Sequence, residues 1–160
     1  PMLRARASLR RERAGLERKL RQHAKDDPVC RLLMTMPGVG AVVALSFKSA
    51  VDDPTRFTSS KTVGPWAGLT PSRQQSGERD ITGGITKAGD IGLRHALCQA
   101  ASVMMYRGRG SWLRTWARRI GKRRGNKRAM VALARRIAVV LHRMWRDGTP
   151  FQPDAAPSPA

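Results

Sequence analysis

A serine beside a glycine is the first feature of the chain that could take part in a chemical reaction. Ser76 precedes Gly77 at the end of residues 68–77, a stretch without a regular apolar period. A serine hydroxyl that attacks phosphorus needs exposure, a base to accept its proton, and cations around the phosphate. The cations nearest in sequence are Arg73, Arg79, Lys87 and Arg94. Ser76 is therefore a candidate nucleophile for phosphoryl transfer, and these four residues are candidate nucleic-acid ligands.

The residues alone leave two points about this stretch open. Ser72 lies four positions earlier and carries the same hydroxyl group. The residue types alone therefore do not decide which of the two serines is the nucleophile. The proton acceptor is also open, because no base stands next to Ser76. Glu78, Asp80 and His95 are the candidates in reach along the chain.

The charge of the chain indicates the class of partner. The sequence carries 31 Lys and Arg against 11 Asp and Glu, a formal net charge of +20 over 160 residues. Between Asp90 and Asp147 there are fifteen basic residues and no acidic one. So much charge repels itself unless a polyanion offsets it, which favours nucleic acid as the partner. An anionic membrane surface is the weaker alternative, because the basic helices also carry apolar faces that a core would use.

The cations after residue 107 surround a tryptophan-containing segment. We expect a solvated basic face that contacts phosphates, because no nearby acid can pair with these side chains. Its predicted ligands are Arg118, Arg119, Arg123, Arg124, Lys127 and Arg128. Trp112 and Trp116 could stack on bases, but their four-residue spacing is that of a core-facing helix stripe, which favours packing in the core.

A second glycine motif lies between two short apolar segments. Pro37-Gly38-Val39-Gly40 has the form of the turn in a helix-hairpin-helix element. Glycines let the backbone turn sharply and approach a phosphate, and the following helix offers unpaired N–H groups. Gly38 and Gly40 are therefore predicted to contact nucleic-acid backbone. The alternative is an ordinary tight turn in which glycine serves geometry alone.

The apolar periodicity predicts a mainly α fold. We expect an N-terminal helical arm over residues 1–27, a small helical core over 28–151 and a disordered tail over 152–160. Within the core, residues 70–90 are polar and glycine-rich, which predicts a loop or short hairpin that carries the serine. The arm has leucines on one seam, typical of either a solvated helix or half of a coiled coil.

Several classes of protein are disfavoured by composition. No stretch approaches the roughly 20 apolar residues that span a bilayer, and the first residues lack an apolar secretory segment, so a cytoplasmic location is expected. Cys30 and Cys98 are expected to be reduced thiols, since their spacing fits no metal motif. The three histidines fall in separate segments. We therefore expect no metal or cofactor to be held by this chain.

Taken in order, the motifs resemble a known family. The matching pieces are residues 36–40, Phe57, residues 66–71, 75–77 and 85–87, Gly89, residues 93–94 and the closing stretch 127–136. They resemble the C-terminal transposase domain of the bridge-RNA-guided insertion-sequence transposases, over roughly residues 34–151. The arm resembles the end of the coiled coil that joins this domain to an N-terminal RuvC-like DEDD nuclease domain.

The resemblance implies roles for individual residues and partners. Ser76 takes the position of the family's nucleophile, which links covalently to a DNA end during strand exchange, and Ser72 does not. Magnesium is expected only in the RuvC-like domain. Assembly is expected to be a homo-oligomer, formed through the arm around a guide RNA that pairs with donor and target DNA.

The chain departs from the family pattern in one respect. Its eleven acids do not form a spaced carboxylate set after a strand, so we expect it to lack the RuvC-like domain, as a truncated gene product or a fragment. On that view it binds nucleic acid but does not catalyse recombination alone. The alternative is a non-catalytic nucleic-acid-binding module, and a basic ribosome- or membrane-associated protein is less favoured.

Overall fold

Helices make up most of the chain. The computed structural model describes residues 2–76, 79–108 and 110–154, and for residues 73–76 and 79–82 it describes the backbone alone. The helices are α1 (Met2–Asp26), α2 (Pro28–Leu33), α3 (Ala41–Val51), α4 (Val63–Trp66), α5 (Ile91–Tyr106), α6 (Trp112–Arg124) and α7 (Asn126–Asp147), with 3-10 turns η1 (Pro54–Arg56) and η2 (Ser60–Thr62). Strands β1 (Pro71–Ser76) and β2 (Arg79–Ile85) form an antiparallel hairpin. The predicted mainly α fold is confirmed.

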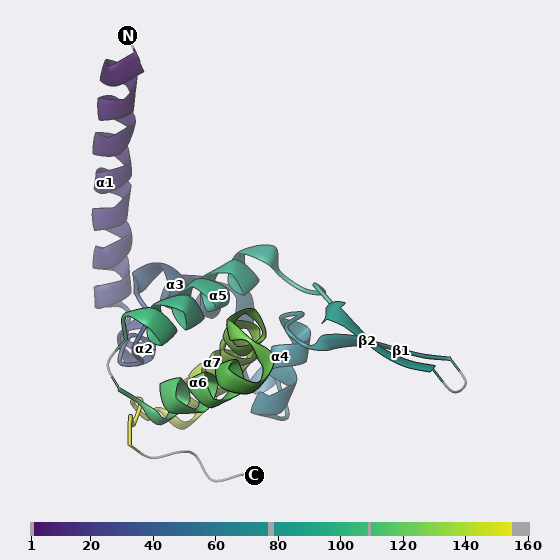
Figure 1. Ribbon diagram of the computed structural model, residues 1–160. Helices are drawn as coiled ribbons and strands as arrows, with labels where there is room; N and C mark the ends of the chain where they lie inside the picture. Colours follow the sequence, from purple (N-terminus) through teal and green to yellow (C-terminus); the bar gives the residue numbers. More distant parts are fainter. Residues whose placement is uncertain (1, 77–78, 109, 155–160) are drawn as a thin grey trace.

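The elements form a helical core with two projections. Figure 1 shows α1 standing away from the cluster of α2 to α7, while the β1–β2 hairpin extends from another side of the same cluster. The polar stretch predicted as a loop or short hairpin is therefore a hairpin. The arm is rich in basic residues, whereas the strands of the hairpin are mostly polar and uncharged, with Ile85 packed against the core.

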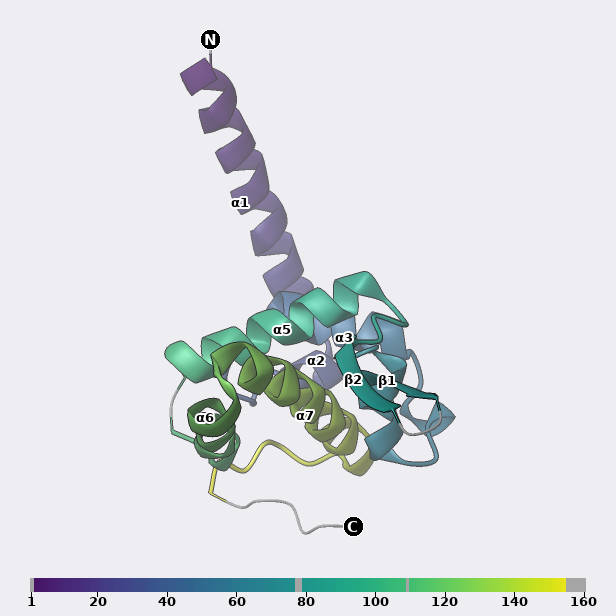
Figure 2. The ribbon, with the colours of Figure 1, turned by 45° about the vertical axis from the view of Figure 1, so that its right-hand side comes forward.

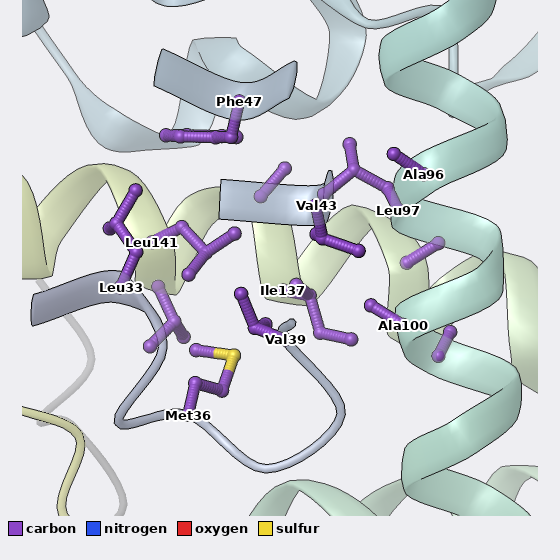
Figure 3. Packing of buried hydrophobic residues seen from close by; sticks show 14 of the residues in the cluster. Leu33, Met36, Val39, Val43, Phe47, Ala96, Leu97, Ala100, Ile137 and Leu141 are labelled. Atoms are coloured by element: carbon purple, nitrogen blue, oxygen red, sulfur yellow. The ribbon is translucent and has the colours of Figure 1, made fainter. Parts of the chain in front are cut away.

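The centre of the core is one face of α7. Its buried positions recur at three- and four-residue steps and include Leu133, Ile137 and Leu141, all fully buried. Burial of each such side chain contributes roughly 1.5–3 kcal/mol. Figure 3 shows Ile137 and Leu141 among side chains of α2, α3, α5 and the turn after α2. One face of α5 is also buried: Leu93, Leu97, Ala100, Ala101 and Met104.

A buried histidine ties α7 to the segment before the hairpin. His142 has no exposed surface. Its Nε2 lies 2.8 Å from the carbonyl oxygen of Pro54, and its Nδ1 lies 2.8 Å from the hydroxyl of Ser60. Because a carbonyl only accepts, Nε2 donates to Pro54, and the Ser60 hydroxyl is the hydrogen-bond partner of Nδ1. The Phe57 ring stands edge-on to His142 and also to Trp66, at 5.4 and 5.2 Å between centroids.

A carboxylate at the junction of α1 and α2 fixes the base of the arm. Asp27 accepts hydrogen bonds from the backbone N–H of Val29 and of Cys30, which caps α2, and it pairs with Lys48 of α3. The Lys48 hydrogen bond and the capping N–H groups lower the pKa of Asp27 below 3.8. Beyond this junction α1 is largely exposed, and Ala24 is its buried residue.

The turn between α2 and α3 is packed against α5. Gly38 has φ +88°, and a Cβ there would lie 2.7 Å from the carbonyl oxygen of Ala100 and 3.2 Å from the backbone nitrogen of Met104. Gly40 is exposed and has open space around its Cβ position. The close backbone approach that Gly38 permits is therefore made to α5. The predicted contact of Gly38 with nucleic-acid backbone stays a prediction.

The chain remains attached to the core beyond residue 151. The backbone N–H of Phe151 donates to the Thr35 hydroxyl at 3.0 Å, and that of Trp112 donates to the Pro153 carbonyl at 3.0 Å. The expected boundary of the tail at residue 152 is thus early; the rest of that expectation falls on residues 155–160, outside the described residues. Among the described helices, none combines the length and the apolar content that crossing a membrane requires.

The two glycines of the turn give a matched stability prediction. Gly38→Ala should lower the free energy of unfolding by about 2 kcal/mol or more. The alanine would have to adopt a left-handed backbone conformation, and its Cβ would overlap α5. Gly40→Ala should cost about 1 kcal/mol or less, since only its role as helix cap changes. Urea denaturation followed by circular dichroism measures both. If both variants lose the same free energy of unfolding, the close packing of Gly38 against α5 does not limit the residue at this position.

The Asp27–Lys48 pair predicts acid sensitivity. The folded-state pKa of Asp27 is lowered, so its contribution to stability is present above the unfolded pKa near 3.8 and is lost as the pH falls through the folded value. Asp27→Asn removes this titration and can still cap α2. The parent should therefore lose more thermal stability than Asp27→Asn between about pH 4 and pH 2. If the melting temperatures of the parent and of Asp27→Asn fall by the same amount over that range, the titration of Asp27 does not account for the acid sensitivity.

Candidate nucleic-acid interface

The serine of the Ser-Gly pair lies at the far end of the hairpin. The backbone register pairs Pro71 with Ile85 at the near end and Ser76 with Arg79 at the far end. At about 3.3 Å per residue, the five steps from Pro71 place Ser76 about 17 Å from the start of the strand. Gly77 and Glu78 lie outside the described residues. The backbone therefore carries Ser76 away from the helical core, with Arg79 at the directly opposed position.

The other serine of the stretch is already engaged. The Ser72 hydroxyl donates to the carbonyl of Gly84 across the hairpin at 3.0 Å. It lies where the pairing is irregular, between Pro71 and Arg73. A nucleophile would have to give up this hydrogen bond before it attacked. The two serines that chemistry could not separate thus differ in structure, and Ser72 has a structural role.

The predicted ligand Arg94 lies inside the protein. Its side chain is 8% exposed. One guanidinium nitrogen, Nη1, donates to the carbonyl of Ala67 at 3.3 Å and to that of Ala88 at 3.0 Å. These carbonyls belong to the segments that enter and leave the hairpin. The structure therefore corrects the expectation that Arg94 faces a phosphate, because burial and backbone contacts occupy its guanidinium.

The remaining candidates near the serine lie partway along the hairpin or at its near end. Arg73 is paired with Thr82, partway along the strands. Lys87 is exposed and follows β2, at the end nearest the core. His95, exposed in the first turns of α5, lies at that same end. Given the length of the strands, Lys87 and His95 are too far from Ser76 to share one phosphate or accept its proton.

The basic face forms a corner between α6 and α7. We name as the basic corner the seven exposed cations Arg118, Arg119, Lys122, Arg123, Arg124, Lys127 and Arg128. Among the described residues, none of the seven forms an ion pair with a carboxylate. Lys127 and Arg128 stand in the first turn of α7, where the helix dipole disfavours cations. Gly125 caps this helix without a side-chain hydrogen bond, so cations and free N–H groups together favour an anion.

The basic corner and the serine hairpin are separate. Helix α5 starts just after the hairpin and runs for 16 residues, about 24 Å, toward α6. Figure 2 shows α6 and the start of α7 beside the C-terminal half of α5, and the hairpin beyond its N-terminal end. The predicted ligands thus form two groups. A ligand that touched both would have to be extended, as a nucleic-acid strand is.

The two tryptophans of α6 belong to the core. Trp112 and Trp116 are partly buried and pack against the apolar cluster. The guanidinium of Arg136 lies over both rings, 5.6 and 5.4 Å from their centroids. This confirms the prediction of core packing. Arg136 thereby joins α7 to α6, next to the basic corner.

The described titratable residues bear on metal binding and on the two thiols. In residues 2–76, 79–108 and 110–154, no three His, Cys, Asp or Glu side chains gather where they could hold a metal ion. Cys30 is buried, Cys98 is partly buried, and both are free thiols. Burial raises the pKa of both thiols, which makes them poor nucleophiles at neutral pH.

Comparison with known families identifies the chain. Residues 30–118, from α2 into α6 and including the serine hairpin, match the family described as "Transposase IS116/IS110/IS902 family". The chain belongs to this transposase family. The resemblance read from the ordered motifs is thus confirmed at the level of the insertion-sequence transposase family, and the guide RNA stays a prediction.

Individual relatives agree with this family. The chain is 31% identical over 138 residues to the transposase for insertion sequence element IS1328 of Yersinia enterocolitica, covering 85% of the chain and 41% of that protein. It is 32% identical over 127 residues to the transposase for insertion sequence element IS1111A of Coxiella burnetii, covering 78% and 35%. A pilin gene-inverting protein of Moraxella bovis is 28% identical over 122 residues, covering 75% and 38%. The chain thus spans about two fifths of the length of these relatives.

Sequence reasoning missed the structural arginines. Arg94 and Arg114 both place the guanidinium on backbone carbonyls; Arg114 donates to Met105 and Gly108 at the end of α5. For Arg94 a signal was available, because its neighbours at i+3 and i+4, Leu97 and Cys98, are apolar. Arg114 is followed at the same steps by Ala117 and Arg118, so its spacing does not set it apart from the exposed arginines. Charge alone gave the opposite answer.

Proposed function

We propose that this chain is the DNA-binding, serine-bearing part of an insertion-sequence transposase that takes part in strand exchange by phosphoryl transfer. The observation that carries the proposal is the place of Ser76, at the far end of a hairpin that leaves the helical core. Phosphate esters of DNA can approach such a position without entering a cleft. Membership of the transposase family supplies the class of reaction.

The chemical step is a transesterification. The Ser76 Oγ loses its proton to a base and forms a bond to phosphorus, and the bond from phosphorus to one bridging sugar oxygen breaks. The released sugar oxygen takes up a proton, and the DNA end stays linked to the protein as a serine phosphodiester. One ester bond replaces another, so the step needs no oxidant and no nucleotide, and a second DNA hydroxyl can reverse it to complete the exchange.

Arginines near the serine stabilise the negative charge of the phosphate. Arg79 is opposite Ser76 in the register, and Arg73 is three positions closer to the core. In a two-stranded ribbon, directly opposed residues are nearest neighbours. Arg79 is therefore our first choice to stabilise the charge that develops on the phosphate oxygens. Lys87, at the near end of the hairpin, is assigned to a different phosphate of the same strand.

The rest of the interface holds the DNA backbone without reading sequence. The basic corner offers seven cations free of carboxylate partners among the described residues. Gly40 and the start of α3 form a second contact, because this helix begins at an exposed glycine without a side-chain cap. This keeps the predicted helix-hairpin-helix contact, with Gly40 as its exposed glycine, while Gly38 also allows the turn to pack against α5.

Further partners follow from the exposed arm and from the length of the relatives. Leu9, Leu16 and Leu20 of α1 are 71%, 61% and 40% exposed, which supports pairing of the arm in a homo-oligomer. Guide RNA is proposed as the partner that selects the DNA. The described residues do not offer a ligand set for magnesium, so no step above runs through a metal. We propose that the chain alone binds DNA and that catalysis needs the rest of the family architecture.

Substitution of the serine tests the chemistry. The chain is mixed with DNA, guide RNA, Mg²⁺ and the N-terminal nuclease domain of a longer family member, and adducts that survive denaturing electrophoresis are counted. Ser76→Ala should lower adduct formation at least about 100-fold, because the attacking oxygen is gone. Ser72→Ala is the matched control and should stay within a few-fold of the parent. If Ser76→Ala forms as much adduct as the parent, Ser76 is not the nucleophile and the chain is a binding module.

Salt dependence of binding tests the basic corner. A corner variant replaces four of its cations by glutamine: Arg123, Arg124, Lys127 and Arg128. If each contacts one phosphate, the slope of log K against log salt concentration should become shallower by about 3 to 4. Fluorescence anisotropy with a labelled duplex, at several salt concentrations, measures the slope.

A second variant controls for net charge. It replaces four exposed cations of α1 by glutamine: Arg4, Arg6, Arg10 and Arg11. The change in charge is the same, but these residues lie on the arm, so the slope should change by about 1 or less. Equal changes in both variants would show that total charge, and not the basic corner, governs the affinity.

A further inference from the structure

The hairpin is attached to the core through a small set of backbone groups. We name residues 67–70 and 86–89, which precede β1 and follow β2, the hairpin root. Two backbone hydrogen bonds close it: the N–H of Thr86 donates to the carbonyl of Thr70 at 2.9 Å, and that of Lys87 donates to the carbonyl of Gly68 at 3.2 Å. Apart from Ile85, which packs against the apolar cluster, the strands lie away from the helices, so the root is the main attachment of the hairpin to the core.

The backbone of the root is tightly constrained. Gly68, Lys87 and Gly89 all have positive φ, at +69°, +57° and +80°. A Cβ on Gly68 would overlap the carbonyl of Ala88, and one on Gly89 would overlap that of Trp66. Lys87 accepts a left-handed conformation that non-glycine residues avoid. Such a conformation persists only where the surroundings enforce it, so the two halves of the root are held in close and specific contact.

Arg94 bridges the two halves of the root. Its Nη1 joins Ala67, in the first half of the root, to Ala88, in the second half. The donor is charged and 8% exposed, and hydrogen bonds from a charged, buried donor are stronger than neutral ones. Because Arg94 lies in the first turns of α5, whose apolar face is buried in the core, it ties the root to the core.

We propose that Arg94 is a positioning residue for the reaction at Ser76: its guanidinium clamps both halves of the hairpin root to α5 and so sets the direction in which the serine is presented. The link to Ser76 rests on the proposed function, whereas the clamp itself does not. A hinge at the root moves the far end most, since the strand is about 17 Å long. A misplacement of about 1 Å at the reacting atoms can cost about 100-fold in rate.

The chain contains a matched control for a merely structural role. Arg114 also donates to two backbone carbonyls, those of Met105 and Gly108, at 3.2 and 2.6 Å. It secures the connection from α5 to α6, at the other end of α5 from the hairpin. Arg114→Met therefore removes an equivalent guanidinium without touching the root, and any general loss of stability should appear in both variants.

The first experiment measures the clamp in this chain alone. Amide hydrogen exchange at Thr86 and Lys87 should accelerate on the order of tenfold or more in Arg94→Met, and less in Arg94→Lys, which keeps the charge and a donor. Arg114→Met should leave these amides unchanged and accelerate exchange at Arg107 and Gly108, which bond to the Val103 carbonyl. Unchanged exchange at Thr86 and Lys87 in Arg94→Met would overturn the clamp.

The second experiment measures the direction of the hairpin. Spin labels are attached to cysteines at Gly84 and Val103, which are exposed on the hairpin and on α5, in a background with Cys30→Ala and Cys98→Ala. The distance distribution should broaden at least about twofold in Arg94→Met and stay narrow in Arg114→Met. A narrow, unshifted distribution in Arg94→Met would show that other contacts aim the hairpin.

The adduct assay then links the clamp to the reaction. Arg94→Met should lower adduct formation at least about 100-fold with DNA affinity within a few-fold of the parent, Arg94→Lys should restore part of it, and Arg114→Met should track its own loss of stability. Full adduct formation with a loosened root would overturn the positioning role. If the parent forms no adduct, the proposed function fails, while exchange and spin-label distances still decide whether Arg94 aims the hairpin.

Discussion

The burial of one face of α7 is the constraint on which the rest of the molecule depends. Leu133, Ile137 and Leu141 lie at the centre of the apolar cluster, where residues of α2, α3 and α5 meet them. The same helix holds the segment before the hairpin through His142 and packs against α6 beside the basic corner. One apolar face thus fixes the base of the arm, the hairpin root and the basic corner relative to one another.

This arrangement separates the work of folding from the work of binding. The core is built from apolar faces and from a few buried polar groups whose hydrogen bonds are internal, such as His142 and Arg94. The exposed cations of the basic corner make no such contacts among the described residues, and their mutual repulsion opposes folding. A charged face of this kind is stable only because the apolar cluster beneath it supplies more free energy than the repulsion removes.

The hairpin shows how a small element can carry a reactive group outside a helical core. Its strands are mostly polar, with Ile85 at the near end packed against the core, and an isolated two-stranded hairpin is marginal in water. The hairpin is therefore ordered mainly by its attachment to the helical core. The left-handed residues of the root and the guanidinium of Arg94 restrict the two points at which the strands join the core. Longer relatives place this part of the chain in a larger protein.

The sequence by itself determined the helices, their buried faces and the family. The three- and four-residue apolar steps of α5 and α7 indicate which side is buried, because residues at these steps lie on one face of a helix. The order of short motifs from residue 36 to residue 136 indicated the transposase family.

Only the tertiary structure decided the use of individual polar residues. Gly38 and Arg94 have the residue types of phosphate ligands, yet α5 occupies the space beside Gly38, and two carbonyls occupy Arg94. Ser72 and Ser76 are alike in chemistry, and they differ because cross-strand register places one against Gly84 and the other at the far end. Such distinctions depend on which segments meet in space, and local spacing carries no record of contacts between residues far apart in the chain.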